Sequence, residues 1–278
     1  MGLKITGKVI FTPSVQSGGG DANLTIQNAS LNGSFDVSSE AASPSGVAFN
    51  DTGSRMFVVG SSSNKVHQYN LSTGFDIQTA NFSGNSKDVS GEDSIPTGVT
   101  FNPTGSLMFV SGRSNDKVYQ YDLSTNFDIN TAIFFFNSLS VGSEDGFPED
   151  ITFNDDGSRL FVAGRGNDSV YQYDLGTAYD VTTASFLQSF DVSSEDGSPQ
   201  GVTFNSTGSR MLVVGAVTKK VYQYNLTTNF DITTATFSGV SLDISSEESF
   251  PLGVTLNSSG TRMFVVGTLS DSIHQYDL

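Results

Sequence analysis

The chain has 278 residues, with 13 basic and 29 acidic side chains, so its formal charge is −16. This acidity argues against a nucleic-acid-binding surface, which needs clustered Lys and Arg, and against binding to an anionic membrane. The absence of cysteine excludes disulfides, thiol nucleophiles and cysteine-ligated metal sites. No apolar stretch is long enough for a membrane span, and the first residues lack the apolar core of a signal peptide.

The first 30 residues stand apart from the rest of the chain, because they contain Lys4 and Lys8 and only one acidic residue. A glycine-rich, flexible stretch at residues 17–20 follows an apolar run. Such a run can add a strand to a partner's sheet, although a loosely packed terminus would show the same pattern. We predict a docking arm and linker over residues 1–30, with the docking side chains Leu3, Ile5, Val9, Ile10 and Phe11.

Residues 31–278 consist of one repeated unit, in which the motif at residues 46–50 recurs at intervals of 51 or 52 residues. In chain order, a unit predicts an inner strand of the Gly-Val-Thr-Phe type, a tight turn, a second strand such as 56–59 and a third such as 66–71. A less regular fourth strand ends in Phe-Asp-Val-Ser-Ser, as at residues 189–193. The units begin near residues 46, 98, 150, 201 and 253.

Units of about 50 residues with four strands each are typical of the blades of a β-propeller. The last unit ends at Leu278 without a fourth strand, whereas an extra fourth strand at residues 34–40 precedes the first unit. If this strand completes the last blade, the two ends of the chain share one sheet and the ring closes. The sequence therefore predicts an all-β, five-bladed propeller of four-stranded blades over residues 31–278, closed by an N-terminal outer strand and preceded by a short arm.

An acidic turn recurs once per unit, between the fourth strand and the next inner strand. Its regularity indicates turn structure, while five carboxylates on one face would also suit Ca²⁺. None of these turns has the spacing of an EF-hand loop. We predict no metal site and no cofactor, and the weak metal candidates are Glu40, Glu92, Glu144, Glu195 and Glu247.

The loops between the second and third strands vary most among the units, and we expect them on the same face as the acidic turns. Their polar side chains could bind sugars, with weak sites reinforcing one another through avidity, although drift in unconstrained loops would give the same variation. The candidate ligand-binding residues are Asn64, Arg113, Asn115, Asp116, Arg165, Asn167, Asp168, Lys219 and Asp271.

Catalysis requires chemically different groups in one place, so a catalytic site should break the five-fold pattern. We find no set of catalytic residues that does so. The two histidines, His67 and His274, stand where other units have tyrosine, so we expect both to be packed residues within strands. We predict no catalytic residue and no enzymatic activity.

The pattern Pro-x-Gly-Val-x-Phe at residues 44–49, continued to Val58, resembles YVTN/NHL-type propeller repeats. The segment at residues 118–132 is similar to repeats in virion-associated propeller proteins of marine bacteriophages, and residues 2–9 resemble the N-terminal leader of such proteins. The resemblance implies a virion protein that binds other virion proteins through residues 1–30 and host-surface glycans through the propeller.

The predicted function is therefore a non-enzymatic structural protein of a phage virion, decorating the capsid or associated with the tail or a fibre. The arm would anchor it, and the propeller would serve interaction or weak adhesion to host glycans, without binding nucleic acid or membrane. Two alternatives stay open. One is a bacterial surface or secreted propeller that binds carbohydrate or protein. The other is a lactonase-like, metal-dependent hydrolase, since propellers support many activities.

Overall fold

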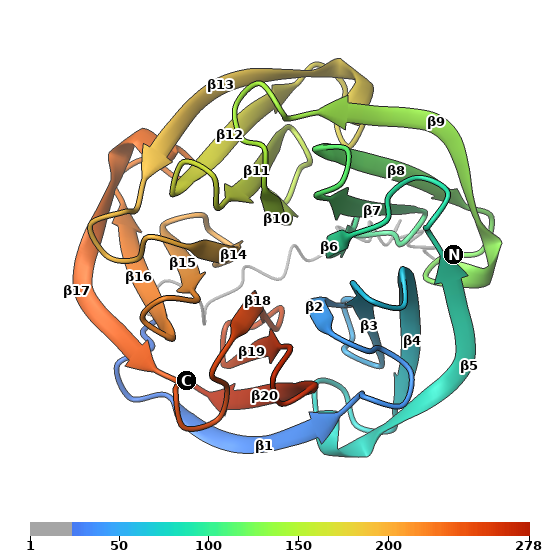
Figure 1. Cartoon of the computed structure of the whole chain (residues 1–278). Helices are drawn as coiled ribbons and strands as arrows, with labels where there is room; N and C mark the ends of the chain where they lie inside the picture. The colour runs from blue at the N-terminus through green and yellow to red at the C-terminus, as the bar shows by residue number, and fades with distance from the viewer. Residues whose placement is uncertain (1–23) are drawn as a thin grey trace, which may run out of the picture.

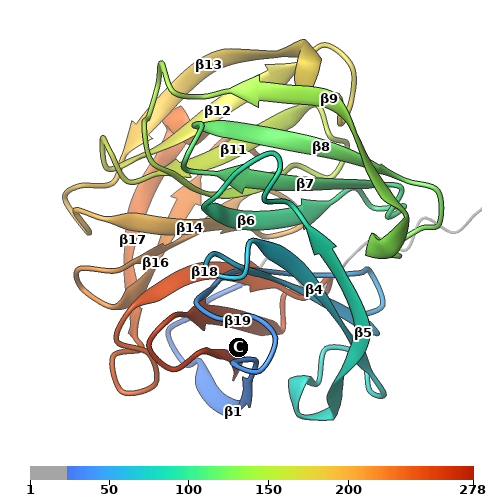
Figure 2. The same ribbon diagram turned by 45° about the vertical axis from the view of Figure 1, so that its right-hand side comes forward.

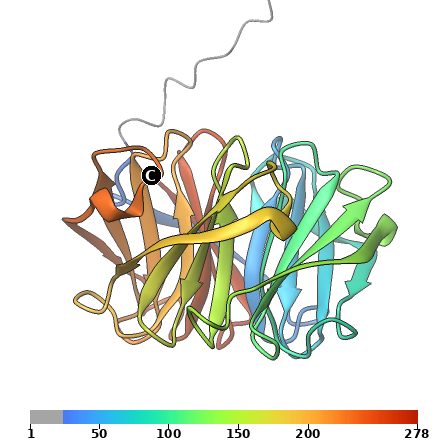
Figure 3. The same ribbon diagram turned by 90° about the horizontal axis from the view of Figure 1, so that it is seen from above.

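The computed structural model describes residues 24–278, which form five four-stranded antiparallel sheets around a central axis (Figure 1). This confirms the predicted all-β, five-bladed propeller. Within a blade the chain moves outward, so that β2, β6, β10, β14 and β18 surround the axis (Figure 1). Seen from the side, the blades form a short disc whose strands run between two faces (Figure 3).

The strand bounds agree from blade to blade. The first blade contains β2 (Pro44–Phe49), β3 (Arg55–Gly60), β4 (Lys65–Leu71) and β5 (Ala80–Asp88), and the second contains β6 (Pro96–Phe101), β7 (Leu107–Gly112), β8 (Lys117–Leu123) and β9 (Ala132–Ser140). The third contains β10 (Pro148–Phe153), β11 (Arg159–Gly164), β12 (Ser169–Leu175) and β13 (Ala184–Asp191). The fourth contains β14 (Pro199–Phe204), β15 (Arg210–Gly215), β16 (Lys220–Leu226) and β17 (Ala235–Asp243), and the fifth contains β18 (Pro251–Leu256), β19 (Arg262–Gly267), β20 (Ser272–Asp277) and β1 (Ser30–Asp36).

The strand β1 closes the ring, as predicted, because it pairs antiparallel with β20 at the other end of the chain (Figure 1). Figure 2 shows β1 beside the C-terminus. Ser34 lies opposite His274 in this ladder, and the N–H of Val37 continues it by donating to the carbonyl of Asp271 at 2.9 Å. The fifth blade therefore has the same four strands as the others, although its outer strand comes from the opposite end of the sequence.

A short connection that the sequence analysis left unassigned joins the third strand to the outer strand. In four blades it is one turn of 3₁₀ helix: η2 (Ile77–Thr79), η3 (Ile129–Thr131), η4 (Val181–Thr183) and η5 (Ile232–Thr234). An aspartate precedes each turn and caps it, as Asp76 does by accepting a hydrogen bond from the N–H of Gln78. The first residue of each turn is fully buried.

The glutamine shared by all five third strands ties each blade to the next. Its side-chain oxygen accepts a hydrogen bond from the backbone N–H of the buried residue that begins the connection in the neighbouring blade. The five pairs are Gln68–Ile129 at 3.5 Å, Gln120–Val181 at 3.1 Å, Gln172–Ile232 at 3.3 Å, Gln223–Ile26 at 3.2 Å and Gln275–Ile77 at 3.1 Å. Because a buried N–H without a partner is costly, this contact explains the invariance of the glutamine.

The contact between Gln223 and Ile26 shows that the blade structure begins before β1. Ile26 occupies the position of Ile77, and Thr25 replaces the capping aspartate by accepting from the N–H of Gln27. Leu24 and Ile26 are both buried among residues of the fourth and fifth blades. Residues 24–30, which the sequence analysis assigned to the arm, therefore pack with the propeller.

The core lies mainly between the blades. The Phe of the second strand in one blade contacts the Phe of the inner strand in the next, as Phe57 does with Phe101 at a centroid distance of 4.3 Å and Phe161 with Phe204 at 4.4 Å. The predicted docking residues Leu3, Ile5, Val9, Ile10 and Phe11 lie outside the described residues. Within residues 24–278, no helix has the length and hydrophobicity needed to cross a membrane.

Candidate ligand-binding site at the mouth of the central channel

The acidic turns and the loops between second and third strands lie together on one face of the disc, which we call the acidic-turn face. The glutamates of these turns, the weak metal candidates of the sequence analysis, bind tyrosines instead of gathering in one place. The tyrosine hydroxyl of the third strand donates to them in the pairs Tyr69–Glu40, Tyr121–Glu92, Tyr173–Glu144 and Tyr224–Glu195, at 3.0–3.3 Å. Burial, and to a smaller extent the nearby carboxylate of Glu247, raises the pKa of the Tyr276 hydroxyl.

In four of the five turns a second carboxylate follows the glutamate and fixes the neighbouring loop. Asp93 accepts hydrogen bonds from the N–H groups of Ser114 and Asn115, and Asp145 accepts them from Gly166 and Asn167. The acidic pairs are therefore turn structures with two separate tasks. Among residues 24–278 no three His, Asp or Glu side chains are grouped so that they could hold a metal ion.

The tyrosine–glutamate contact predicts a measurable loss of stability in Tyr121→Phe. Tyr121 is fully buried, while Glu92 keeps some exposure to water after the hydroxyl is removed. We expect the free energy of unfolding to fall by about 1 kcal/mol in urea titrations. Glu92→Ala should remove the same contact, so the double variant should lose less than the two single losses together. Additive losses would contradict this assignment.

Seven of the nine candidate loop residues serve the turn itself. Asn64, Asp116, Asp168, Lys219 and Asp271 occupy one equivalent position with φ between 47° and 58°, a region that Asn and Asp tolerate better than other side chains. The Nδ2 groups of Asn115 and Asn167 donate to the carbonyls of Glu92 and Glu144, at 2.9 and 2.8 Å.

The remaining two candidates, Arg113 and Arg165, converge on a residue that the sequence analysis did not single out. Nη1 of Arg113 lies 2.9 Å from Oε1 of Glu149, and Nε of Arg165 lies 3.0 Å from the same oxygen. Glu149 is only 5% exposed. Burial raises the pKa of Glu149, whereas the two guanidiniums oppose this shift by stabilising the carboxylate.

These three side chains line a cavity of about 310 Å³ where the central channel opens on the acidic-turn face. Hydroxyl and amide groups of Ser45, Thr97 and Gln200 line it further, together with Phe250. The position of Glu149 holds Ser45, Thr97, Gln200 and Leu252 in the other blades, and the position of the two arginines holds Ser61, Ala216 and Thr268. The mouth of the channel is thus asymmetric in a propeller whose turns are otherwise regular.

Asp150, next to Glu149, replaces the glycine of the other four inner strands. That glycine allows close approach of neighbouring strands, because a Cβ at Gly46 would lie 2.9 Å from the Cα of Gly98. The Asp150 carboxylate accepts hydrogen bonds from the N–H groups of Ile151 at 2.9 Å and Val202 at 3.3 Å. Burial raises the pKa of Asp150 well above its usual range. The departure from Pro-x-Gly to Pro-Glu-Asp at residues 148–150 is the sequence signal that could have identified this site.

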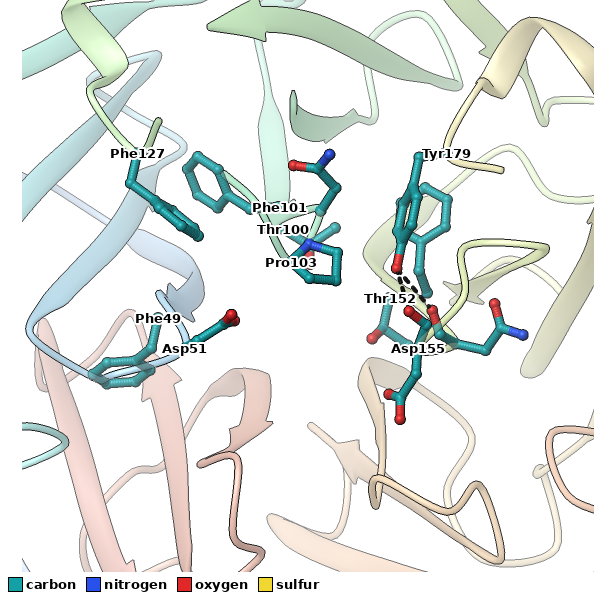
Figure 4. Close-up of a pocket in the computed structure, with 12 residues that line it drawn as sticks. Phe49, Asp51, Thr100, Phe101, Pro103, Phe127, Thr152, Asp155 and Tyr179 are labelled. Atoms are coloured by element: carbon teal, nitrogen blue, oxygen red, sulfur yellow. Dashed lines mark hydrogen bonds between the residues drawn. The ribbon is translucent and has the colours of Figure 1, made fainter. Parts of the chain in front are cut away.

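The opposite mouth of the channel has a different chemistry (Figure 4). A cavity of about 150 Å³ is lined there by Phe49 and Phe101, the last residues of β2 and β6, and by Asp51 from the turn after β2. Tyr179 closes one side by donating its hydroxyl to the carbonyl of Asp155 at 2.7 Å (Figure 4). Among residues 24–278, no arginine or lysine lines this cavity. The cationic pair is therefore confined to the acidic-turn face.

The two histidines belong to neither mouth. His274 contacts the hydroxyls of Ser34 and Ser270 at 2.8 and 3.0 Å, and His67 contacts that of Ser63 at 3.1 Å. Both are 4% exposed, and burial lowers the pKa of His67 to about 4. They are buried strand residues, as their alignment with tyrosine predicts.

Comparison with solved structures shows the fold alone. The β-propeller domain of Cps50 (Swd1) from Myceliophteria thermophila is 10% identical, with a TM-score of 0.51, covering 90% of this chain and 99% of that one. A nidogen/laminin complex matches at 16% identity and TM-score 0.54, covering 84% of this chain and 76% of that one. A Bacteroides uniformis protein assigned as a 6-phosphogluconolactonase matches at 13% identity and TM-score 0.53. The match covers 83% of this chain and 65% of the Bacteroides protein. No protein-family model and no curated protein matches the chain.

Proposed function

We propose that the protein is a non-enzymatic interaction protein of a phage-like virion, anchored through its N-terminal residues and binding a ligand through the acidic-turn face. The virion setting follows from the resemblance of the repeats at residues 118–132 and of residues 2–9. A propeller suits interaction because it presents many loops on a rigid ring. Among the solved relatives, the nidogen/laminin complex is an example of a propeller that takes part in a protein complex.

The observation that supports ligand binding is the position of the asymmetry. Turn and strand positions recur around the ring and have structural partners in the propeller itself. By contrast, Arg113, Glu149 and Arg165 come together once, at a cavity open to solvent. Concave sites with a few convergent polar groups are the usual places for ligands. Adhesion to host-surface glycans is the role we propose for this mouth.

The anchoring half of the proposal is tested by removing residues 1–20. The deletion stops there because Leu24 and Ile26 pack with the blades and should be kept. We expect the shortened protein to fold, with an unchanged circular dichroism spectrum, but to be absent from purified particles assembled in its presence. Arg113→Ala serves as the control, because it should join particles as well as the unaltered chain. Equal incorporation of the deletion variant would overturn the anchoring role.

The alternative of a lactonase-like hydrolase is tested on the same purified protein. We expect no turnover of sugar lactones, with or without added Ca²⁺. Turnover that Arg113→Ala or Glu149→Gln abolishes would replace the proposed adhesion with an enzymatic function at this mouth.

A further inference from the structure

We propose that the mouth formed by Arg113, Glu149 and Arg165 binds a sugar that carries a single carboxylate, such as a uronic acid residue of an acidic glycan. This inference rests on the proposed function in one respect, that the acidic-turn face is where the propeller binds its ligand. It adds the chemical class of that ligand, which follows from the donors, the charge and the lining of the cavity.

Several hydrogen-bond donors of the two arginines have no partner within the propeller. Arg113 contacts Glu149 through Nη1, and Arg165 contacts it through Nε, so each guanidinium uses one nitrogen for the carboxylate. Within residues 24–278, Nη2 of Arg113 and both Nη groups of Arg165 have no protein acceptor. The arginine side chains are 29% and 34% exposed, and they line the cavity. Guanidinium N–H groups that face a cavity suit an oxyanion, which two of them can hold in a planar fork.

Other side chains of the protein hold these donors in position. Glu149 is buried and holds both guanidiniums through one oxygen, while the ring of Phe147 lies 5.0 Å from the guanidinium carbon of Arg165. Arginines held by a buried carboxylate and an aromatic ring lose less conformational freedom when a ligand binds. The pair is therefore prepared for a ligand before it arrives.

The charge of the mouth bears on the choice of ligand. Among the residues that line the cavity, two guanidiniums and one carboxylate leave a single net positive charge, in a chain of formal charge −16. The surrounding turns carry Glu92 and Glu144, among other carboxylates, which repel ligands of high negative charge. One carboxylate balances the mouth, whereas a phosphate dianion would exceed it. This favours a carboxylated sugar over a sugar phosphate.

The size and the remaining lining of the cavity suit a sugar. Its volume of about 310 Å³ lies at the lower end of the range for small-molecule sites and suits one sugar ring. Ser45, Thr97 and Gln200 supply hydroxyl and amide groups that can exchange hydrogen bonds with sugar hydroxyls. Phe250, which is 40% exposed, offers an apolar surface at the rim for the face of the ring.

The test measures binding of three monosaccharides to the purified full chain at neutral pH and low salt, by isothermal titration calorimetry and ligand-observed NMR. The probes are glucuronate, glucose and glucose 6-phosphate. We expect one glucuronate per chain, bound at least about tenfold more tightly than glucose and more tightly than glucose 6-phosphate. Glucose bound as tightly as glucuronate, or no glucuronate binding at millimolar concentration, would overturn the proposal.

Variants then locate the site. Arg113→Ala and Arg165→Ala should each weaken glucuronate binding about tenfold or more, and Arg113→Lys should also weaken it, because lysine keeps the charge but lacks the fork. Lys117→Ala removes one positive charge from the same blade outside the cavity and should leave binding unchanged. Equal effects of Lys117→Ala and Arg113→Ala would show that only the overall charge matters and would contradict the site.

Glu149→Gln tests the charge argument separately. It raises the net charge of the mouth, so the preference should shift from glucuronate toward glucose 6-phosphate. An unchanged order of preference would contradict the balance that we infer. The assay involves no particles, so failure here leaves the anchoring role of residues 1–20 untouched, and failure of anchoring leaves sugar binding intact.

Discussion

A chain that begins at Ser39 should fail to form a stable propeller, and the same chain should fold again when residues 21–38 are attached after Leu278. The shortened chain lacks β1, so the ladder with β20 is lost and one blade keeps only three strands. It also lacks Ile26, whose N–H binds Gln223, and Phe35, whose ring packs edge-on against Tyr69 at 5.7 Å. We expect a loss of at least about 5 kcal/mol, comparable with the whole stability of many domains.

The rescue is expected because the repeat is circular. Leu278 directly follows the third strand of its blade, in the sequence position of Leu71, and Leu24 stands where the first blade has Phe75. Residues 21–23 therefore correspond to residues 72–74, and a direct bond between Leu278 and Asp21 restores the spacing of the other blades. Attaching a scrambled version of residues 21–38 is the matched control.

Thermal melting and circular dichroism measure both variants. Cooperative unfolding of the rearranged chain near the temperature of the unaltered protein, with the scrambled chain unfolded or aggregated, is the expected result. A shortened chain that melts cooperatively without its outer strand would show that β1 is dispensable for closure.

The second large effect is a gain of stability in Asp150→Gly. Asp150 is buried in the channel beside Glu149, and its pKa is raised mainly by that burial. A raised pKa in the folded state means that the folded protein holds this proton more tightly than the unfolded chain does. The contribution of the carboxyl to stability is therefore fully present below pH 3.8 and is lost as the pH rises through the folded-state pKa.

Glycine at this position occurs in the other four blades, so the substitution should fit without strain. We expect a gain of about 2 kcal/mol at pH 8, shrinking toward low pH. Asp150→Asn keeps the size of the side chain but only one acceptor oxygen, so it can serve only one of the N–H groups of Ile151 and Val202. It should show the same pH trend with a smaller gain. The measurement is urea unfolding of each protein at several pH values between 4 and 8. If either variant kept the pH dependence of the unaltered chain, the carboxyl of Asp150 would not be its cause.

Much of the fold could be predicted from the sequence, because the repeat places equivalent residues at equivalent points of each blade. The shared closing blade followed from the extra strand near Phe35 and from the missing strand after Leu278. The role of the invariant glutamines could not be predicted, since Gln120 and Val181 are far apart in the chain and meet only when blades pack side by side. The start of the packed region was missed because Leu24 and Thr25 replace the Phe and Asp of the other units.

For the candidate site, sequence reasoning found Arg113 and Arg165 but grouped them with loop residues whose side chains or backbones serve the turns. Polar composition alone does not distinguish a residue that needs positive φ, such as Asp116, from one that faces a cavity. Glu149 was missed because residues 150–154 were aligned as one more copy of the repeat, and the departure from glycine at Asp150 was not used. The ion pairs that unite Glu149 with both arginines depend on side-chain directions across two blades.

The number of blades, the order of their strands, the closure by β1 and the shared face of the acidic turns could all be read from the repeat. These follow from local patterns, since strand periodicity and turn residues act over a few positions and the repeat multiplies their effect. The folded arrangement was needed to distinguish polar residues that have partners within the propeller from those that face the mouth of the channel. That distinction depends on packing between blades, because burial and distance, rather than residue type, determine whether a charge is paired or available to a ligand.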